Sequence, residues 1–182
     1  MNWEELEEKC AKCTLCGLSE TRTNTVFGCG DRKSRIMFVG EAPGEHEDLE
    51  GVPFVGRAGK LLDDYFKALE IDREKVYICN ILKCRPPKNR DPLPAEEDAC
   101  MDYLRWQVRL INPKYIVCLG RIAAQRLIGP DFKMTVDHGK WFAKGPFYVC
   151  GVFHPSYLLR NPAGKKEEML TDLKMIKKDT GI

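Results

Sequence analysis

Short apolar runs alternate with segments of helical periodicity along this chain. Four runs are rich in valine, isoleucine, tyrosine and phenylalanine and are bounded by glycine, proline or charged residues, which predicts buried strands. These runs are Arg35 to Gly40, Val76 to Leu82, Tyr115 to Gly120 and Phe147 to Phe153. Apolar residues at helical spacing predict four helices, which are Arg57 to Leu69, Pro94 to Ile111, Arg121 to Leu127 and Lys166 to Lys178.

Strands and helices in alternation predict an α/β fold, a three-layer sandwich with a central four-stranded parallel sheet between helices. Residues Met134 to Gly145 are compatible with an additional hairpin. The length of 182 residues, without long linkers or internal repeats, fits one domain over residues 1–182. Residues 1 to about 30 combine a short amphipathic helix with a turn, and we expect them to form an appendage on this domain.

The charge pattern adds little to this picture. A formal net charge of +2 does not by itself indicate a nucleic-acid partner. Basic residues do cluster, in one group at Lys83, Arg85, Lys88 and Arg90 and in another among the C-terminal lysines. No apolar run approaches the length of a membrane span, and the first residues lack the pattern of a secretory signal. We therefore expect a reducing, cytoplasmic location.

The cysteines are the most informative residues. Cys13 and Cys16 form a C-x-x-C pair, and Cys84 and Cys100 follow far downstream, among nine cysteines in total. In a reducing compartment, thiolates gathered from distant segments indicate a metal centre rather than disulfides. The spacing favours an iron-sulfur cluster over a zinc ribbon, which more often shows two close pairs. A zinc site remains the alternative.

Polar residues follow three of the predicted strands. Glu41 opens an acidic loop after the first strand, Asn80 interrupts the end of the second, and His154 follows the fourth. Each has an ordinary structural explanation on its own, as a turn, a strand-end amide or a hydrogen-bonded histidine. Parallel strands bring their carboxyl ends to one edge of the sheet, so we expect these three residues to share a cleft.

The segment Gly51 to Ala58 has the two-glycine spacing of a phosphate loop. Arg57 and Ala58 stand where lysine and serine or threonine are required, so nucleotide hydrolysis is not expected. Phe54, between prolines and glycines, suits a stacking platform for a planar ligand such as a base. The alternative is that Phe54 belongs to the core.

Four longer motifs occur in order along the chain. They are GEAPG with its acidic continuation at Gly40 to Asp48, PFVGRAGKLL at Pro53 to Leu62, VYICNILKCRPPKNRDP at Val76 to Pro92, and HPSYLLRNP at His154 to Pro162. Together they resemble the iron-sulfur uracil-DNA glycosylases of bacteria and archaea, known as family 4. The resemblance runs from about Lys12 to Lys178.

This resemblance implies a monofunctional enzyme that flips uracil out of single- or double-stranded DNA. It would hydrolyse the N-glycosidic bond and leave an abasic site in base excision repair. A structural 4Fe-4S cluster would be held by Cys13, Cys16, Cys84 and Cys100, with Cys10 as a competing ligand. We expect a monomer.

The resemblance also implies roles in the pocket. Phe54 would stack on uracil, Asn80 would pair with O4 and N3-H, Glu47 or its neighbours would crowd C5, and His154 would donate to O2. The substrate-binding set is Glu41, Ala42, Pro43, Phe54, Asn80 and His154.

Ala42 replaces the aspartate that orients the attacking water in better-known uracil glycosylases. Glu41 is our first candidate for holding this water and Glu47 the second. Residues Tyr157, Leu158, Leu159 and Arg160 are expected to form a finger that wedges into DNA, with Arg160 on a phosphate. The alternative is that Leu158 and Leu159 are core.

Two alternatives differ from this expectation, one in mechanism and one in function. A related subgroup traps uracil covalently through a histidine in an insertion within the segment Lys83 to Pro92, but here that segment is short and has no histidine, so ordinary turnover is expected. The chain could also be a noncatalytic iron-sulfur protein that binds DNA or serves as a scaffold.

Overall fold

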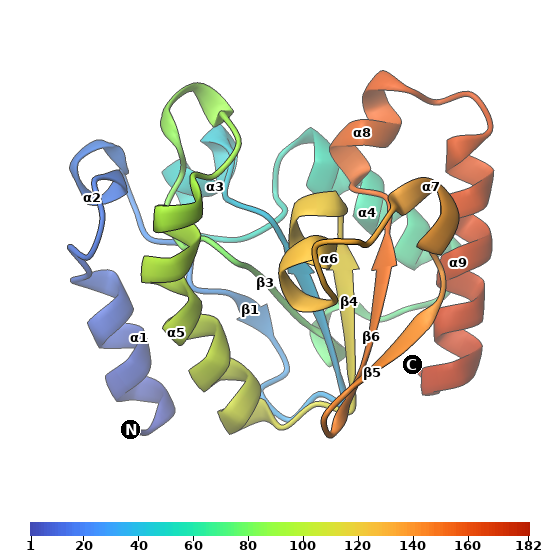
Figure 1. The fold of residues 1–182 in the computed structure, drawn as a ribbon, viewed down its shortest axis with the longest axis horizontal. Helices are drawn as coiled ribbons and strands as arrows, with labels where there is room; N and C mark the ends of the chain where they lie inside the picture. Colours follow the sequence, from blue (N-terminus) through green and yellow to red (C-terminus); the bar gives the residue numbers. More distant parts are fainter.

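A six-stranded sheet runs through the molecule, with helices on both faces (Figure 1). The computed structural model describes residues 1–182. The strand order is β1-β3-β2-β4-β6-β5, in which β3, β2, β4 and β6 are parallel and the two edge strands are antiparallel to their neighbours. The strands are β1 (Cys29–Gly30), β2 (Ile36–Gly40), β3 (Tyr77–Asn80), β4 (Tyr115–Leu119), β5 (Trp141–Lys144) and β6 (Phe147–Val152).

Nine α-helices and two short 3-10 turns lie before, between and after these strands. The helices are α1 (Trp3–Ala11), α2 (Leu18–Thr21), α3 (Glu45–Glu50), α4 (Arg57–Ala68), α5 (Pro94–Ile111), α6 (Arg121–Leu127), α7 (Met134–Asp137), α8 (Pro155–Arg160) and α9 (Lys165–Thr180). The 3-10 turns are η1 (Arg73–Lys75) and η2 (Pro87–Asn89).

The predicted α/β fold is confirmed, because the four predicted strands form the parallel centre of the sheet. The edge strand β1 was not predicted. The hairpin expected at Met134 to Gly145 is wrong for its first half, since Met134–Asp137 is helical and only β5 pairs with β6. The acidic loop after β2 contains the helix α3, which begins where Gly44 and Glu47 form a cap.

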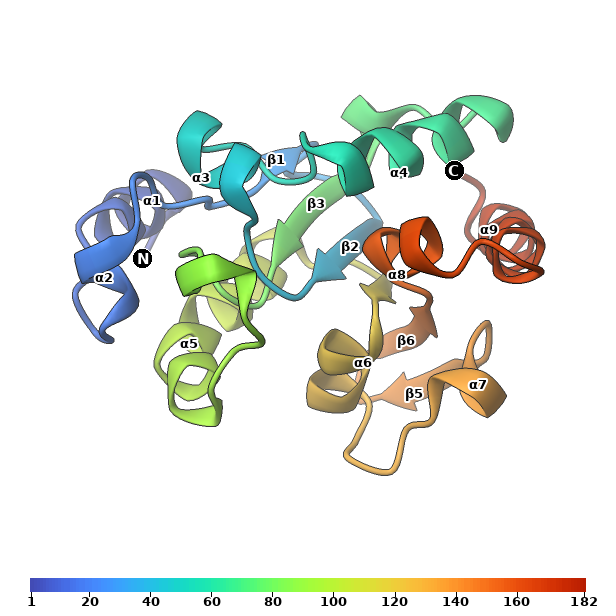
Figure 2. The same cartoon turned by 90° about the horizontal axis from the view of Figure 1, so that it is seen from above.

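Alternation along the strands divides the core into two layers. In β2, Ile36 and Phe38 face α4 and α9, whereas Met37 and Val39 face α5 and α6. Figure 2 shows the sheet passing between these helix pairs. All residues of β2 and β3 are buried, as expected for central strands of a parallel sheet. Two packed faces therefore hold the carboxyl ends of the strands in place.

A third apolar cluster joins the N-terminal helices to α5. It contains Leu6 from α1, Leu18 from α2 and Tyr103 from α5, together with several cysteines. The first turn of α1 is closed by a capping box in which Asn2 and Glu5 exchange hydrogen bonds of 2.8 and 2.9 Å. The N-terminal segment thus packs on the outer side of α5.

None of the helices combines the length and the apolar character needed to cross a membrane.

Phe66 tests the layer under α4. It is 2 % exposed and meets Phe38 edge to face, with 5.1 Å between ring centroids. We expect Phe66→Ala to lower the free energy of unfolding by about 3–5 kcal/mol, measured by urea titration. Val136→Ala is the control, because this side chain is 60 % exposed and should change stability by no more than about 0.5 kcal/mol. Equal stabilities for the two variants would contradict this description of the core.

Candidate functional site

The structure brings the predicted strand-end residues together. Glu41, Asn80 and His154 line one hollow of about 350 Å³ at the carboxyl edge of the sheet, and Phe54 lines it as well. Glu41 directly follows β2, Asn80 is the last residue of β3, and His154 caps α8 just after β6. The hollow has the size of a small-molecule site.

The backbone of Gly40 forms the point where these groups meet. Gly40 pairs with Asn80 across the parallel strands β2 and β3. A β-carbon on Gly40 would overlap the Asn80 carboxamide oxygen and the Phe54 ring. The Phe54 and His154 rings lie 5.8 Å apart between centroids. The Phe54 ring and the Asn80 amide therefore meet over a residue that has no side chain, and the His154 imidazole lies beside the Phe54 ring.

Asn80 has an unused hydrogen-bonding atom. The side chain is 1 % exposed, and its oxygen Oδ1 has no hydrogen-bond partner in the protein. Buried polar atoms are almost always paired, because an unpaired one costs about 1–3 kcal/mol. An orphan oxygen on a residue that lines a hollow indicates a ligand that donates a hydrogen bond to it.

His154 is held as a neutral ring with a defined tautomer. The Ser156 backbone N–H donates to His154 Nδ1 over 3.0 Å, and the Ser156 hydroxyl lies 2.7 Å from the same nitrogen. A backbone amide can only donate, so Nδ1 is an acceptor and the ring proton is on Nε2. Burial, and next the charge of Arg160, lower the pKa of His154 to about 4. At neutral pH this residue is an uncharged donor through Nε2–H.

Glu41 shows the opposite shift. Burial is the main cause that raises its pKa to about 7, and the nearby charge of Asp91 adds to it. Arg121 and Arg160 oppose the rise. Glu41 therefore changes charge near neutral pH, as a carboxyl group in a functional pocket often does.

Glu47 lines the same hollow, but its carboxylate is already engaged. It accepts hydrogen bonds from the backbone N–H groups of Gly44 at 3.1 Å, Val55 at 3.1 Å and Gly56 at 3.0 Å. Both oxygens are used, so Glu47 organises the loop around Phe54. Ala42 and Pro43 also line the hollow.

The predicted DNA finger is a helix. Leu158 is fully buried in the core between α4 and α9. The expectation that its side chain inserts into DNA is therefore wrong for this residue. Tyr157 is half-buried and stacks on Phe153, with 5.7 Å between centroids. Leu159 is half-buried, and Arg160 is exposed and lines the hollow. The adjacent apolar residues of this segment belong to the short helix α8, which packs one of them into the core.

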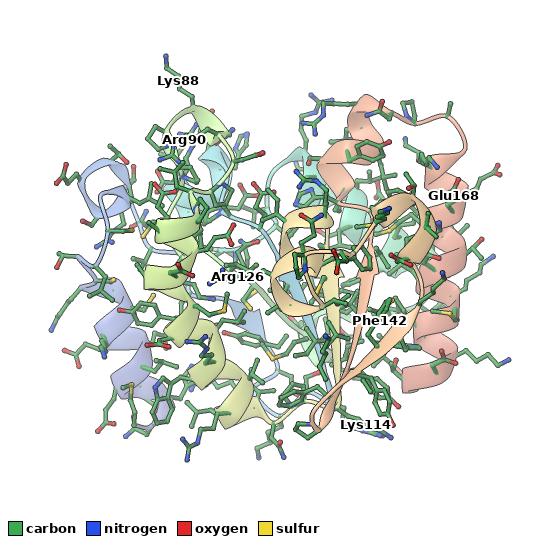
Figure 3. The ribbon with its side chains drawn as sticks, viewed as in Figure 1. Lys88, Arg90, Lys114, Arg126, Phe142 and Glu168 are labelled. Atoms are coloured by element: carbon green, nitrogen blue, oxygen red, sulfur yellow. The ribbon has the colours of Figure 1, made fainter.

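The predicted basic group is also divided by the fold. Lys83 is 1 % exposed and is not a surface residue. Arg90 forms two hydrogen bonds with Glu96, at 2.6 and 2.9 Å. Lys88 projects outward from the turn at the carboxyl edge of the sheet (Figure 3).

A second hollow gathers the cysteines. Cys13, Cys16, Cys84 and Cys100 line it, and Cys10 does so too. Arg22 Nη1 donates to Cys84 Sγ and the Lys83 backbone N–H donates to Cys100 Sγ, each over 3.3 Å. Burial raises the pKa of Cys100 to about 11, so its thiolate requires a nearby cation. No three cysteine, histidine or carboxylate side chains converge as ligands of a single metal ion.

Sequence reasoning did not identify Ser156 or Gly40 as site residues. Ser156 sets the tautomer of His154, and its only signal was its position at the start of the segment after β6. Gly40 ends an apolar run, where a glycine usually indicates a turn. The need for a bare backbone there follows from the contacts alone.

Comparisons with known proteins agree with this architecture. Residues 27–174 match the family model described as the uracil DNA glycosylase superfamily. The chain is 46 % identical over 173 residues to the type-4 uracil-DNA glycosylase of Thermotoga maritima, covering 93 % of this chain and 89 % of the relative. It is 44 % identical over 184 residues to the type-4 enzyme of Archaeoglobus fulgidus, covering 95 % and 90 %.

A type-5 uracil-DNA glycosylase from Pyrobaculum aerophilum is more distant, with 30 % identity over 164 residues, 79 % of this chain and 71 % of the relative. The match to the type-4 proteins is thus both stronger and more complete. With its parallel sheet and the hollow at the carboxyl edge, the chain belongs to the uracil-DNA glycosylase superfamily and, within it, to the type-4 uracil-DNA glycosylases.

Proposed function

We propose that this chain hydrolyses the bond between uracil and deoxyribose in DNA, as a monofunctional glycosylase that leaves an abasic site for base excision repair. The observation that carries the proposal is the orphan Oδ1 of Asn80, on a residue that lines the same hollow as a neutral histidine donor. Family membership supplies the reaction class. The target base is buried inside a duplex, so it must rotate out to reach this hollow.

Asn80 selects the base in this mechanism. Its Oδ1 accepts from uracil N3–H, and its amide group donates to O4. Cytosine presents an acceptor at N3 and a donor at C4, so both hydrogen bonds would be lost and buried groups left unpaired. Phe54 stacks on the base, and the backbone of Ala42 and Pro43 holds its edge. Glu47 helps to exclude the thymine methyl group through the loop that it organises.

His154 stabilises the leaving group. Negative charge accumulates on uracil O2 as the bond breaks, and the Nε2–H of the neutral ring donates to it. The ring is already oriented by Ser156, so no reorganisation is needed when the charge develops. Removal of such a donor costs about 2.7–4 kcal/mol of transition-state stabilisation.

Glu41 holds the attacking water and stabilises the positive charge on the sugar. We prefer it to Glu47 because the Glu47 oxygens accept three backbone hydrogen bonds. Ala42 offers no carboxylate for this task. The charged form of Glu41 is the one that can accept a proton from water.

Uracil-containing DNA, single- or double-stranded, approaches the carboxyl edge in this proposal. Arg160 contacts a phosphate, and Tyr157 and Leu159 lie along the DNA strand. Leu158 takes no part in this contact because it is buried. We further propose one domain over residues 1–182, a monomer and a cytoplasmic location.

We propose that the cysteines of the second hollow hold a 4Fe-4S cluster. Four thiols from three separate segments of the chain line this hollow, which matches the number and type of ligands that a cluster takes. Buried Lys83 donates to the Asn80 carbonyl at 2.8 Å and to Gln107 Oε1 at 2.7 Å, but no carboxylate pairs with it. A cluster with four thiolates carries net negative charge and would balance this cation.

Cys13, Cys16, Cys84 and Cys100 would hold the cluster, and Cys10 stands behind them in α1. When bound, the cluster supplies metal–thiolate bonds that cross-link the N-terminal segment to the loop after β3 and to α5. Its role in this proposal is structural. The residues of the uracil pocket perform the cleavage.

His154→Ala tests the role of the imidazole. We expect uracil release from a single-stranded oligonucleotide, measured in single-turnover assays, to fall by about 10²–10³-fold. Asn80→Ala should also reduce uracil release strongly, since the side chain proposed to hydrogen-bond uracil N3–H and O4 is lost. Binding of the same oligonucleotide, measured by fluorescence anisotropy, should persist in both variants. The control is Lys114→Gln, at the opposite edge of the molecule (Figure 3). DNA binding without uracil release by the unmodified protein would identify a noncatalytic iron-sulfur protein.

The raised pKa of Glu41 predicts how the rate of uracil release depends on pH. With its pKa raised to about 7, the carboxylate gains a proton as pH falls through 7, so the rate should decline on the acid side. Glu41→Gln should be slow and should lose this dependence. His154, with a pKa of about 4, adds no transition between pH 5 and 8. The raised Glu41 pKa also destabilises the fold as pH rises from about 4.5 to 7, so Glu41→Gln should melt higher at pH 8. An unchanged pH profile in this variant would reject Glu41 as the base.

Iron analysis tests the second hollow. Anaerobically purified protein should be brown and contain about four iron and four sulfide atoms per chain. Cys100→Ser should lose this absorbance, whereas the matched variant Cys10→Ala should retain it. Colourless protein with bound zinc would contradict the cluster. Loss of iron in Cys10→Ala would show that Cys10 is a ligand in place of one of the four proposed cysteines.

A further inference from the structure

Phe54 has an unfavourable backbone conformation. Its φ angle is +53°, in the left-handed region that bulky side chains rarely adopt. Such a conformation is strained and persists only where neighbouring groups hold it. The ring that this backbone carries is the one that meets Asn80 over Gly40.

Arg73 holds the carbonyl side of this loop. From the turn η1, its Nη1 donates to the Phe54 carbonyl at 3.0 Å and its Nη2 donates to the Pro53 carbonyl at 2.7 Å. Asp63 on α4 aims the guanidinium through a contact of 2.5 Å with Nη1. Arginine suits this task because its rigid fork can reach two adjacent acceptors.

Glu47 holds the amide side of the same loop. Its Oε1 accepts from the N–H groups of Val55 and Gly56, the two residues that follow Phe54. The loop therefore has a cation on its carbonyls and an anion on its amides. A β-carbon on Gly59 would overlap the Phe54 carbonyl, so α4 also confines this loop from below.

We propose that Arg73 and Glu47 form a two-charge clamp that sets the position of the Phe54 ring, and that Arg73 is a positioning residue for uracil binding. The inference rests on the proposed stacking role of Phe54. Without the clamp, the Phe54 backbone relaxes toward negative φ and the ring leaves its place beside Asn80. Uracil binding then weakens although Arg73 never touches the base.

The test measures inhibition by free uracil and the kcat and KM for uracil release. Stacking of a base on an aromatic ring contributes enough affinity that its loss should weaken uracil inhibition about tenfold or more in Arg73→Gln. KM should rise more than kcat falls. Arg73→Lys retains charge but not the fork, and should recover only part of the affinity. Arg32→Gln is the matched control, since Arg32 pairs with exposed Glu4 and makes no hydrogen bond to this loop.

A double-mutant comparison separates positioning from general stability. If Arg73 acts through the ring, Arg73→Gln should add nothing to the loss of uracil affinity caused by Phe54→Ala. An additive loss, or an unchanged affinity in Arg73→Gln, would overturn the clamp. Should Arg73→Gln fail to fold, Asp63→Asn, which leaves the guanidinium unaimed, is compared with Phe54→Ala in the same way. Failure of the proposed function would appear differently, as an unmodified protein that releases no uracil.

Discussion

The close approach of three elements over the bare backbone of Gly40 is the constraint on which the site depends. The pairing of β2 with β3 sets Gly40 beside Asn80, and the loop before α4 lays Phe54 against the same point. Any side chain there would separate the ring from the amide. The sheet is packed on both faces and all residues of β2 and β3 are buried, so the positions of Gly40 and Asn80 relative to each other are fixed.

The pocket holds several groups in states that cost stability. Asn80 leaves an oxygen unpaired, Glu41 is shifted toward its neutral form, and Phe54 has a left-handed backbone. These features lie together at the carboxyl edge, whereas the two core layers beneath it are apolar and regular. Several destabilising features in one small region are typical of functional sites, where groups are preorganised to bind a ligand.

The segment from Asn80 to Cys84 connects the two hollows. Asn80 lines the first, Cys84 lines the second, and Lys83 between them donates a hydrogen bond from Nζ to the Asn80 carbonyl. The backbone N–H of Lys83 also donates to Cys100. A metal centre in the second hollow would therefore stabilise the turn that carries Asn80, although it lies outside the proposed chemistry.

Local patterns in the sequence were enough to predict the four parallel strands, the long helices and the exits that carry Glu41, Asn80 and His154, because side-chain periodicity and strand-end position are properties of neighbouring residues. The long motifs also identified the family. Tertiary structure alone decided that Lys83 and Leu158 are buried, that Glu47 serves three backbone amides, and that Ser156 sets the histidine tautomer. A charged or apolar residue has the same sequence signal on a surface as in a core, and only partners from distant segments determine which environment it occupies.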